Sequence, residues 1–210
     1  MQGMDDIGVL HWAAIKGHGP LAKMAISKGA DLNEPCCRSL PESDRFERGC
    51  TPLHLAIMYD SPDVIRALIE AGAQLFATGE NARGPLGMGG YPSAFPGETP
   101  LHLAAKYSAT RSVSVLRDLC PASDMTQFNE RLGRMPGHPA ARFGTVSTME
   151  AFLQAGFNIS ALDRYGGTVL HAALGFKPRN CEVMEYLLGQ EGSSSSIFKI
   201  VLGIPSYTRP

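Results

Sequence analysis

Histidine and cysteine are the side chains of this sequence whose chemistry would suit a metal site, and it has six histidines and five cysteines. Structural zinc is held by four such ligands, commonly in closely spaced pairs such as Cys-x-x-Cys. The cysteines lack that spacing and are odd in number; they are Cys36, Cys37, Cys50, Cys120 and Cys181. We therefore expect thiols rather than a disulfide framework, and no metal site.

Nucleophilic catalysis would need a serine, threonine or cysteine beside a base that activates it. The sequence contains no Gly-x-Ser-x-Gly, His-Glu-x-x-His or phosphate-binding Walker motif. The adjacent Cys36 and Cys37 have no neighbouring histidine or helix N-terminus that would activate a thiol. These patterns predict no catalytic residue and no cofactor.

Five of the six histidines occupy one position of a recurring tetrapeptide. Thr51-Pro52-Leu53-His54 returns as Thr99-Pro100-Leu101-His102 and, with valine for proline, as Thr168-Val169-Leu170-His171. Weaker copies end at His11 and His138, and an alanine follows two residues after each of the five histidines. Repetition on this scale indicates a repeat protein, in which the repeat itself sets the histidine positions.

The elements that position these residues follow from the same pattern. Threonine at an N-cap accepts a backbone hydrogen bond, and proline at the first helical position already has the helical φ. A glycine lies 18 residues after His11, His54 and His138, at the end of a second amphipathic segment. Glycine takes the left-handed conformation at a helix C-terminus without steric cost. Each unit is therefore predicted to be a helix, a turn, a second helix and a glycine stop.

The stretch Asp163–Ala173 resembles the ankyrin repeat, whose pattern is Asp-x-x-Gly-x-Thr-Pro-Leu-His-x-Ala-Ala. The resemblance implies an all-α ankyrin-repeat solenoid of about five helix-turn-helix repeats, with hairpin loops along one edge. The expected repeats cover about residues 5–33, 46–75, 94–122, 130–159 and 163–192, within one domain of residues 1–192. The third repeat has Cys120-Pro121 where the terminal glycine is expected, and the fourth has Met135 in place of threonine.

In the ankyrin family, the motif histidine bridges the threonine hydroxyl and the backbone of a neighbouring repeat. That structural role carries over to the pairs Thr51 and His54, Thr99 and His102, and Thr168 and His171. His11 and His138 lack the threonine, which leaves their second partner open. Stacked repeats hold equivalent residues about 10 Å apart, whereas zinc ligands lie about 2 Å from one ion. The histidines are therefore not expected to share a metal.

The intervals from position 8 to Thr51 and from Thr51 to Thr99 clearly exceed the family period of about 33 residues, because the two connections within them are expanded. The first covers residues 34–48, and the second, residues 76–97, has six glycines and three prolines, too many for a helix. Ser193–Ser196 then lead into an apolar tail that is too short to span a membrane. Segment 193–210 either folds back to cap the last repeat or forms a disordered end, and the sequence leaves both open.

Aromatic and basic residues recur where each first helix is expected to end. Five residues after the motif histidines stand Lys16, Tyr59, Tyr107, Phe143 and Phe176, and one position earlier stand Lys106 and Arg142. In the ankyrin family these positions face a concave groove and contact partners. The expected hairpin tips add Phe95, Arg131, Arg134, Arg164 and Tyr165.

These side chains suggest what the groove would bind. Aromatic and arginine side chains dominate binding hot spots, and arginine matches carboxylates geometrically. We expect repeats three to five to bind an acidic or aromatic-containing segment of another protein, which makes the chain an interaction scaffold or adaptor. The competing interpretation is that the rings pack under the next helix and the arginines are solvated.

A second class of function is a small-molecule-binding protein or an enzyme. The loop of residues 76–97 would then act as a lid over a pocket lined by Tyr107, Arg142 and Tyr165, and the ligand would be acidic or aromatic. The absence of a nucleophile or an acid–base pair at matching positions disfavours an enzyme. An enclosed pocket beneath the loop would distinguish this class from an open scaffold.

The overall charge is -1 with a pI near 6.6, which gives no general attraction to nucleic acid or to an anionic membrane. The arginines are scattered among acidic residues without a basic run, which argues against nucleic-acid binding. Asp5 and Asp6 stand where a secretory signal would be basic, and no apolar stretch reaches 18 residues. We therefore expect a cytoplasmic or nuclear protein that does not enter a membrane.

Overall fold

A computed structural model describes residues 7–36, 50–75, 99–120, 133–175 and 180–190. Within these ranges the regular secondary structure consists of ten helices and contains no strand. The helices are α1 (Val9–Lys16), α2 (Gly19–Ser27), α3 (Pro52–Met58), α4 (Pro62–Glu70), α5 (Pro100–Lys106), α6 (Thr110–Leu119), α7 (Gly137–Phe143), α8 (Val146–Gln154), α9 (Val169–Leu174) and α10 (Cys181–Gln190). They form five consecutive helix-turn-helix pairs, which confirms the expected all-α solenoid.

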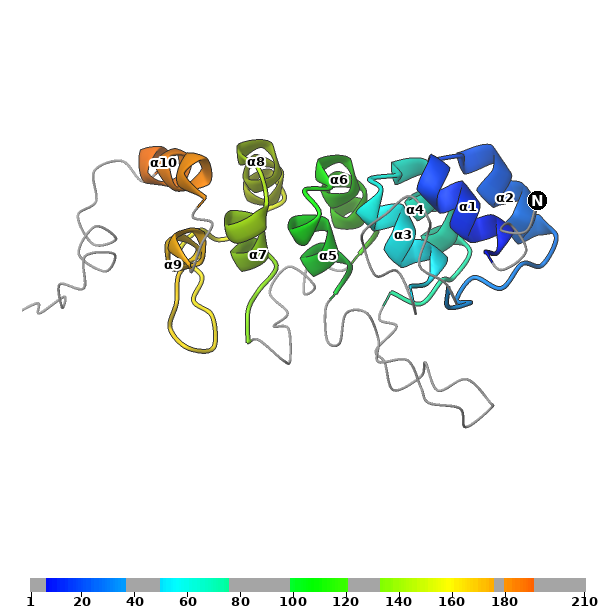
Figure 1. The fold of residues 1–210 in the computed structure, drawn as a ribbon, viewed down its shortest axis with the longest axis horizontal. Coiled ribbons are helices and arrows are strands. Elements are labelled where there is room, and N and C mark those ends of the chain that lie inside the picture. The colour runs from blue at the N-terminus through cyan, green and yellow to red at the C-terminus, as the bar shows by residue number, and fades with distance from the viewer. Residues whose placement is uncertain (1–6, 37–49, 76–98, 121–132, 176–179, 191–210) are drawn as a thin grey trace, which may run out of the picture.

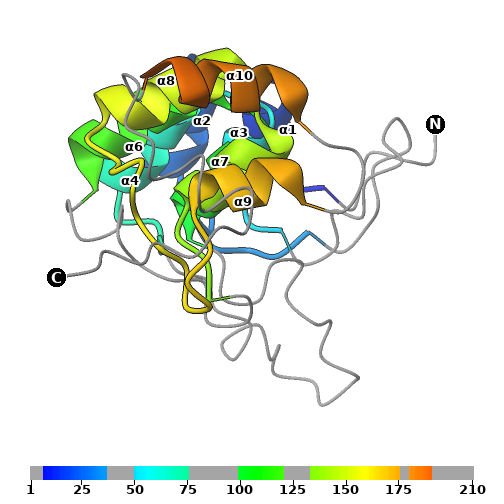
Figure 2. The ribbon, with the colours of Figure 1, turned by 90° about the vertical axis from the view of Figure 1, so that its left-hand side faces the viewer.

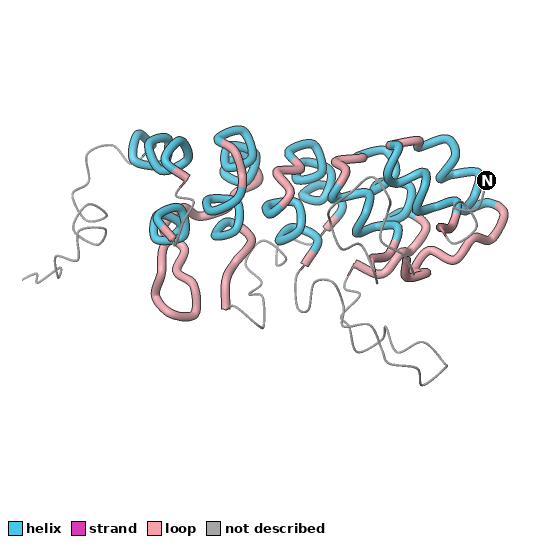
Figure 3. Tube along the Cα trace, viewed as in Figure 1, coloured by secondary structure: helices cyan, strands magenta, loops and turns pink. Residues whose placement is uncertain are grey.

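The ten helices are arranged in two layers (Figure 1). The odd-numbered helices, here called the first-helix layer, pack against one another in chain order, and the even-numbered helices form a parallel second-helix layer. Viewed from the C-terminal end, α7 and α9 lie on one side of α8 and α10 (Figure 2). The described connections between repeats extend from the first-helix layer, on the side away from the second (Figure 3). Among the described helices, the main contacts of each repeat are therefore with its neighbours along the stack.

Capping residues determine where the first helices begin. Thr51, Thr99 and Thr168 have extended backbones, and each hydroxyl oxygen accepts a hydrogen bond from the N–H of the motif histidine. Pro52 and Pro100 follow directly as the first residues of α3 and α5. The threonine hydroxyl satisfies an otherwise unpaired N–H, and proline has no N–H that would need an acceptor, so the helix start is fixed locally.

Glycines follow the second helices of three repeats in the left-handed conformation. Gly29, Gly72 and Gly156 have φ values of 82°, 90° and 93°, and a Cβ at any of them would meet no atom within 4 Å. Backbone conformation rather than space therefore requires glycine at these positions. α6 ends differently, because Cys120 is extended and has no glycine after it.

The leucines of the tetrapeptide lie inside the stack. Leu10, Leu53, Leu101 and Leu170 are at most 2% exposed and belong to one continuous apolar core. The alanines that follow the motif histidines are equally buried; they are Ala13, Ala56, Ala104, Ala140 and Ala173. Small side chains at these positions let neighbouring first helices approach closely, while the leucines fill the space between repeats.

Repeat four builds the same core with different residues. Gly137 stands where the other repeats have the tetrapeptide leucine, and Phe157 stands where repeats one and two have Ala30 and Ala73 after the terminal glycine. A Cβ at Gly137 would overlap the Phe157 ring, which is 6% exposed. The ring also packs edge-on against Phe152, with centroids 6.4 Å apart. Phe157, which follows the terminal glycine Gly156, therefore occupies the space that the tetrapeptide leucine fills in the other repeats.

Several expectations fall outside the part of the chain that the structure describes. They concern most of the first expanded connection, the whole loop of residues 76–97 and the tail of residues 193–210. The candidate binding residues Phe95, Arg131 and Phe176 also lie outside it. Among the described helices, none is long and apolar enough to cross a bilayer.

Candidate functional site

The motif histidines form paired hydrogen bonds with their threonines. Thr51 N–H donates to His54 Nδ1 at 3.1 Å, and the Thr51 hydroxyl oxygen lies 3.0 Å from the same nitrogen. The pair Thr99 and His102 repeats these contacts at 3.3 and 2.8 Å. Thr168 and His171 do so at 3.2 and 2.9 Å. Because Nδ1 accepts a backbone N–H, the ring proton resides on Nε2.

The other ring nitrogen joins one repeat to the connection that follows it. His102 Nε2 donates to the carbonyl of Arg134 at 2.8 Å. His11 Nε2 contacts the carbonyl of Glu34 at 2.9 Å, and His138 Nε2 contacts that of Gly167 at 3.0 Å. The two histidines without a threonine therefore keep the inter-repeat contact. In repeats one, three and four, the motif histidine is therefore a structural bridge along the first-helix layer.

Burial keeps His11, His54 and His102 neutral near pH 7 because it lowers the pKa of each. Desolvation lowers the pKa of His54 and of His102 to about 4, although the Arg134 carbonyl partly opposes the effect at His102. Burial also lowers the pKa of His11, against the opposing effects of the Glu34 carbonyl and carboxylate. Within the described ranges, no cluster of three metal-ligating side chains occurs. The histidines thus act as hydrogen-bonding links.

Repeats one and four lack the motif threonine, and the hydrogen bonding of the motif histidine Nδ1 differs between them. In repeat one, Gly8 is the N-cap, and His11 Nδ1 is buried without a hydrogen-bond partner. A Cβ at Gly8 would lie 3.0 Å from this nitrogen and 2.9 Å from Glu34 Oε2, so a side chain at this position would adjoin the unpaired nitrogen once the end of the Glu34 side chain shifts. In repeat four, His138 Nδ1 lies 3.3 Å from the carbonyl of Met135. A neutral ring can donate to only one of the two carbonyls that His138 contacts.

The residues at the C-terminal ends of the first helices differ in exposure. The residue Phe143 is 51% exposed and Tyr59 is 37% exposed, whereas Tyr107 is half-buried and packs against the core. Lys16 is exposed, and its ammonium lies 5.4 Å from the centre of the Trp12 ring. We call Lys16, Tyr59, Tyr107 and Phe143 the helix-end row. Its aromatic rings are therefore neither all buried nor all exposed.

Arg142 and Phe143 form a stacked pair at the end of α7. The Arg142 guanidinium carbon lies 4.9 Å from the Phe143 ring centre, within the range of a cation–π contact. The same guanidinium passes over Gly175, where a Cβ would lie 3.9 Å from it. The Ser108 hydroxyl donates to the Phe143 carbonyl at 3.5 Å, which places this pair beside the turn of repeat three. A planar cation and an exposed ring thus lie side by side where repeats three to five meet.

The hairpin tips of repeats four and five touch each other. Arg164 N–H donates to the carbonyl of Gly133 at 2.7 Å, and the Arg164 side chain crosses the space where Gly133 has no Cβ. Tyr165 is 76% exposed and Leu162 is 50% exposed. The Asp163 carboxylate accepts from the N–H groups of Tyr165 and Gly167, so it is engaged within the tip. Arg134 is half-buried, and its carbonyl is the acceptor from His102.

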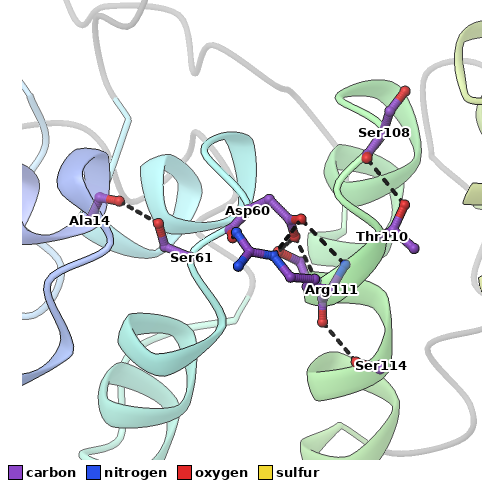
Figure 4. Close-up of polar contacts among 8 residues, drawn as sticks. Ala14, Asp60, Ser61, Ser108, Thr110, Arg111 and Ser114 are labelled. Atoms are coloured by element: carbon purple, nitrogen blue, oxygen red, sulfur yellow. Dashed lines mark hydrogen bonds and ion pairs between the residues drawn. The ribbon is translucent and has the colours of Figure 1, made fainter.

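Sequence reasoning missed one polar link between repeats two and three (Figure 4). Asp60 has a positive φ of 50° and occupies the position six residues after His54, where repeat one has Gly17. Its carboxylate accepts from Ser112 N–H at 2.7 Å and from the Ser112 hydroxyl at 2.8 Å. Arg111 donates from Nε to the same carboxylate at 3.2 Å and from Nη2 to the Asp60 carbonyl at 2.7 Å. The sequence did contain a signal for this link, because Asp60 stands where repeat one has Gly17, at a left-handed position that few other residues adopt.

Comparison with family models matches two parts of the chain. Residues 4–79 match "ankyrin repeats (3 copies)" and residues 138–188 match "ankyrin repeats (many copies)", together more than half of the sequence. The chain belongs to the ankyrin repeat family. The ankyrin repeats of this chain thus include the fourth, in which a glycine and a methionine replace two motif residues.

Three curated proteins are similar to parts of this chain. The nuclear factor NF-kappa-B p105 subunit of Gallus gallus is 27% identical over 81% of this chain and 16% of its own length. NF-kappa-B inhibitor alpha of Mus musculus is 29% identical over 53% of this chain and 32% of its own. Protein phosphatase 1 regulatory subunit 27 of Homo sapiens is 33% identical over 36% of this chain and 42% of its own. The chain thus covers less than half of each of these three relatives.

Proposed function

We propose that this chain is a protein–protein interaction scaffold or adaptor that binds a segment of another protein along repeats three to five, over Tyr107 and Phe143 of the helix-end row. Ankyrin repeats are generally protein-interaction modules. The observation that carries the proposal is the stacked pair of Arg142 and the exposed Phe143 at the end of α7. A ring and a guanidinium combine apolar area with a carboxylate-binding fork, which is the composition of a binding hot spot.

Charge supports an acidic partner. In the described parts of repeats three to five, the first-helix layer and the tips carry Lys106, Arg134, Arg142 and Arg164, and their one carboxylate, Asp163, already binds backbone N–H groups. In the second-helix layer, α6 of repeat three carries Arg111, Arg117 and Asp118, whereas the described charges of α8 and α10 in repeats four and five are all acidic; they are Glu150, Glu182 and Glu185. This separation favours approach of an acidic chain from the first-helix side.

The relatives support the class of function but not the partner. The names NF-kappa-B inhibitor alpha and protein phosphatase 1 regulatory subunit 27 describe proteins that act on other proteins. By extension, we propose that the present chain acts through protein contacts in the cytoplasm or nucleus, with residues 1–192 as one repeat domain. The small-molecule or enzyme alternative depends on the loop of residues 76–97, which lies outside the described residues, and it stays a prediction.

Selection from a random peptide library displayed on phage tests the proposal without a known partner. We expect the enriched peptides to combine acidic and aromatic residues, because Arg142 and Phe143 present complementary groups. Affinity would then be measured by fluorescence anisotropy for the wild type and for R142A and F143A. Each variant should bind at least about tenfold more weakly, which corresponds to about 1.4 kcal/mol.

A matched control is available on the other layer. Arg117 in α6 is exposed and pairs with its neighbour Asp118, so R117A removes the same side chain from the second-helix layer. Binding by R117A should equal that of the wild type, and circular dichroism should show unchanged helix content in all three variants. Enrichment of peptides without acidic residues, or equal affinity for wild type and R142A, would contradict the proposal.

A further inference from the structure

Two buried cysteines face one junction of the stack. Cys36 ends the described part of repeat one, and Cys50 begins that of repeat two; their exposures are 2% and 0%. Cys36 N–H donates to the carbonyl of Cys50 at 2.8 Å. Two residues before Cys36, the Glu34 carbonyl accepts from His11, and Thr51 directly after Cys50 caps α3. The cysteines therefore belong to the joint between the first two repeats.

The backbone hydrogen bond limits how far apart the two cysteines can be. The N–Cα bond on the Cys36 side and the Cα–C–O geometry on the Cys50 side place the two Cα atoms at most about 6.7 Å apart. Disulfides join Cα atoms that are about 4.4 to 6.8 Å apart. The separation thus permits a bond between these residues, although both are thiols in the structure.

We propose that Cys36 and Cys50 are a redox pair, which forms an intramolecular disulfide in the presence of an oxidised low-molecular-weight disulfide such as oxidised glutathione. One cysteine thiolate attacks a sulfur of oxidised glutathione, which releases one glutathione thiolate and leaves a mixed disulfide. The second cysteine thiolate then attacks the protein sulfur of this mixed disulfide and releases the second glutathione. The two protein thiols lose two electrons and two protons, and oxidised glutathione is reduced to two glutathione molecules.

The disulfide would fasten the joint between repeats one and two. It closes a loop over residues 37–49 and lowers the conformational entropy of the unfolded chain, which raises the melting temperature. Burial slows the first attack, because each thiol must become accessible through local opening of the joint. Once formed, the buried bond is shielded from external reductants in the same way. The proposal is independent of what the helix-end row binds.

Mass spectrometry of the full chain tests this pairing. The reduced protein is incubated with oxidised glutathione, the remaining thiols are alkylated in denaturant, and tryptic peptides are analysed without reduction. Cys36 and Cys37 share the tryptic peptide of residues 29–38, so the C37S variant identifies which of them is bonded. We expect a peptide linked to Cys50 in both the wild type and C37S, and a higher melting temperature that dithiothreitol reverses.

The controls separate the pairing from other thiol chemistry. C36S and C50S should lose both the linked peptide and the rise in melting temperature, whereas C120S should keep both. A Cys37–Cys50 or Cys36–Cys37 bond, mixed disulfides alone, or intermolecular links would overturn the proposal. Retention of all thiols after long incubation would overturn it equally. The wild-type peptide map shows whether the peptide of residues 29–38 is linked to Cys50, and C37S, which keeps Cys36 and Cys50, assigns the bond. Instability of C36S or C50S therefore does not affect the conclusion.

Discussion

The Phe157 side chain fills the space that Gly137 leaves open. In the other four repeats, the residue at the Gly137 position is a buried leucine, and the residue after the terminal glycine in repeats one and two is alanine. Repeat four has exchanged a large and a small residue between the two sites. The exchange preserves the volume of the core, to which cores are more sensitive than to the identity of each residue.

This exchange predicts strong coupling between the two positions. G137L should destabilise the chain by about 2–3 kcal/mol because the new side chain overlaps the ring, and F157A by about 3 kcal/mol because it leaves a cavity. The double variant G137L/F157A restores the arrangement of the other repeats and should lose much less than the sum. Urea denaturation of the four proteins measures the coupling energy. Additive losses would show that the two sites do not share one space.

The Gly8 position predicts a stabilising substitution. His11 Nδ1 is buried without a partner, whereas a threonine hydroxyl contacts the equivalent nitrogen in repeats two, three and five. Gly8 has φ -60° and ψ 153°, an extended conformation that threonine also adopts. G8T should therefore be more stable than the wild type by a few tenths of a kcal/mol, and more stable than G8A by about 1 kcal/mol, the usual value of an N-cap hydroxyl relative to alanine.

G8A is the control for this substitution. It places the same Cβ beside His11 Nδ1 and the flexible end of the Glu34 side chain but supplies no hydroxyl. The stability difference between G8T and G8A, measured by thermal and urea unfolding, isolates the hydrogen bond. If the two variants are equally stable, the unpaired nitrogen contributes nothing that a hydroxyl could recover.

The fold was predictable because the repeat uses strong local signals. Threonine with proline starts a helix and glycine ends one, so Thr51, Pro52 and Gly72 mark a repeat without knowledge of its neighbours. The contacts between repeats were less predictable. The role of Phe157 depends on what repeat four lacks at Gly137, and the role of Asp60 depends on a serine 52 residues away.

The candidate binding surface shows the same limit. The register placed Tyr107 and Phe143 at the same position of successive first helices, where the structure also has them, at the ends of α5 and α7. It gave no means of knowing that one ring is half-buried and the other 51% exposed. Exposure depends on the neighbouring repeat, such as the small Gly175 beneath Arg142. Spacing therefore predicts the position of a side chain more reliably than its availability.

The Asp60 link predicts which of its contacts stabilise the stack. Ser112 is fully buried, and S112A should cost about 1–2 kcal/mol because it removes a donor to a carboxylate. The Arg111 side chain is 69% exposed in its ion pair with Asp60, so R111A should cost less than about 0.5 kcal/mol. Urea unfolding of the two single variants compares the contributions. A larger loss for R111A than for S112A would contradict this ranking.

Asp60 itself combines a favourable link with an unfavourable backbone conformation. D60A should cost about 2 kcal/mol, since alanine neither accepts from Ser112 nor tolerates φ 50° well. D60G removes the same hydrogen bonds but relieves the left-handed strain, so it should be more stable than D60A by about 1 kcal/mol. Equal stability of the two variants, again from urea unfolding, would mean that the backbone conformation at this turn changes with the side chain.

The neutral histidines predict loss of stability in mild acid. Burial lowers the pKa of His54 and His102 to about 4, whereas unfolded histidines titrate near 6.5. Between these values the unfolded chain binds more protons than the folded chain, so stability is fully present above pH 6.5 and falls as the pH decreases toward 4. Each histidine contributes a slope of up to about 1.4 kcal/mol per pH unit.

Urea unfolding at several pH values between 4 and 8 measures this slope, with H102Q as the comparison. Glutamine keeps an N–H that can donate to the Arg134 carbonyl but does not titrate, so the variant should be less stable at pH 7 and lose stability less steeply below pH 6.5. NMR titration of the His102 ring in the folded wild type should show no protonation at pH 6. Equal slopes for the wild type and H102Q would mean that His102 takes up its proton in the folded chain as readily as in the unfolded one.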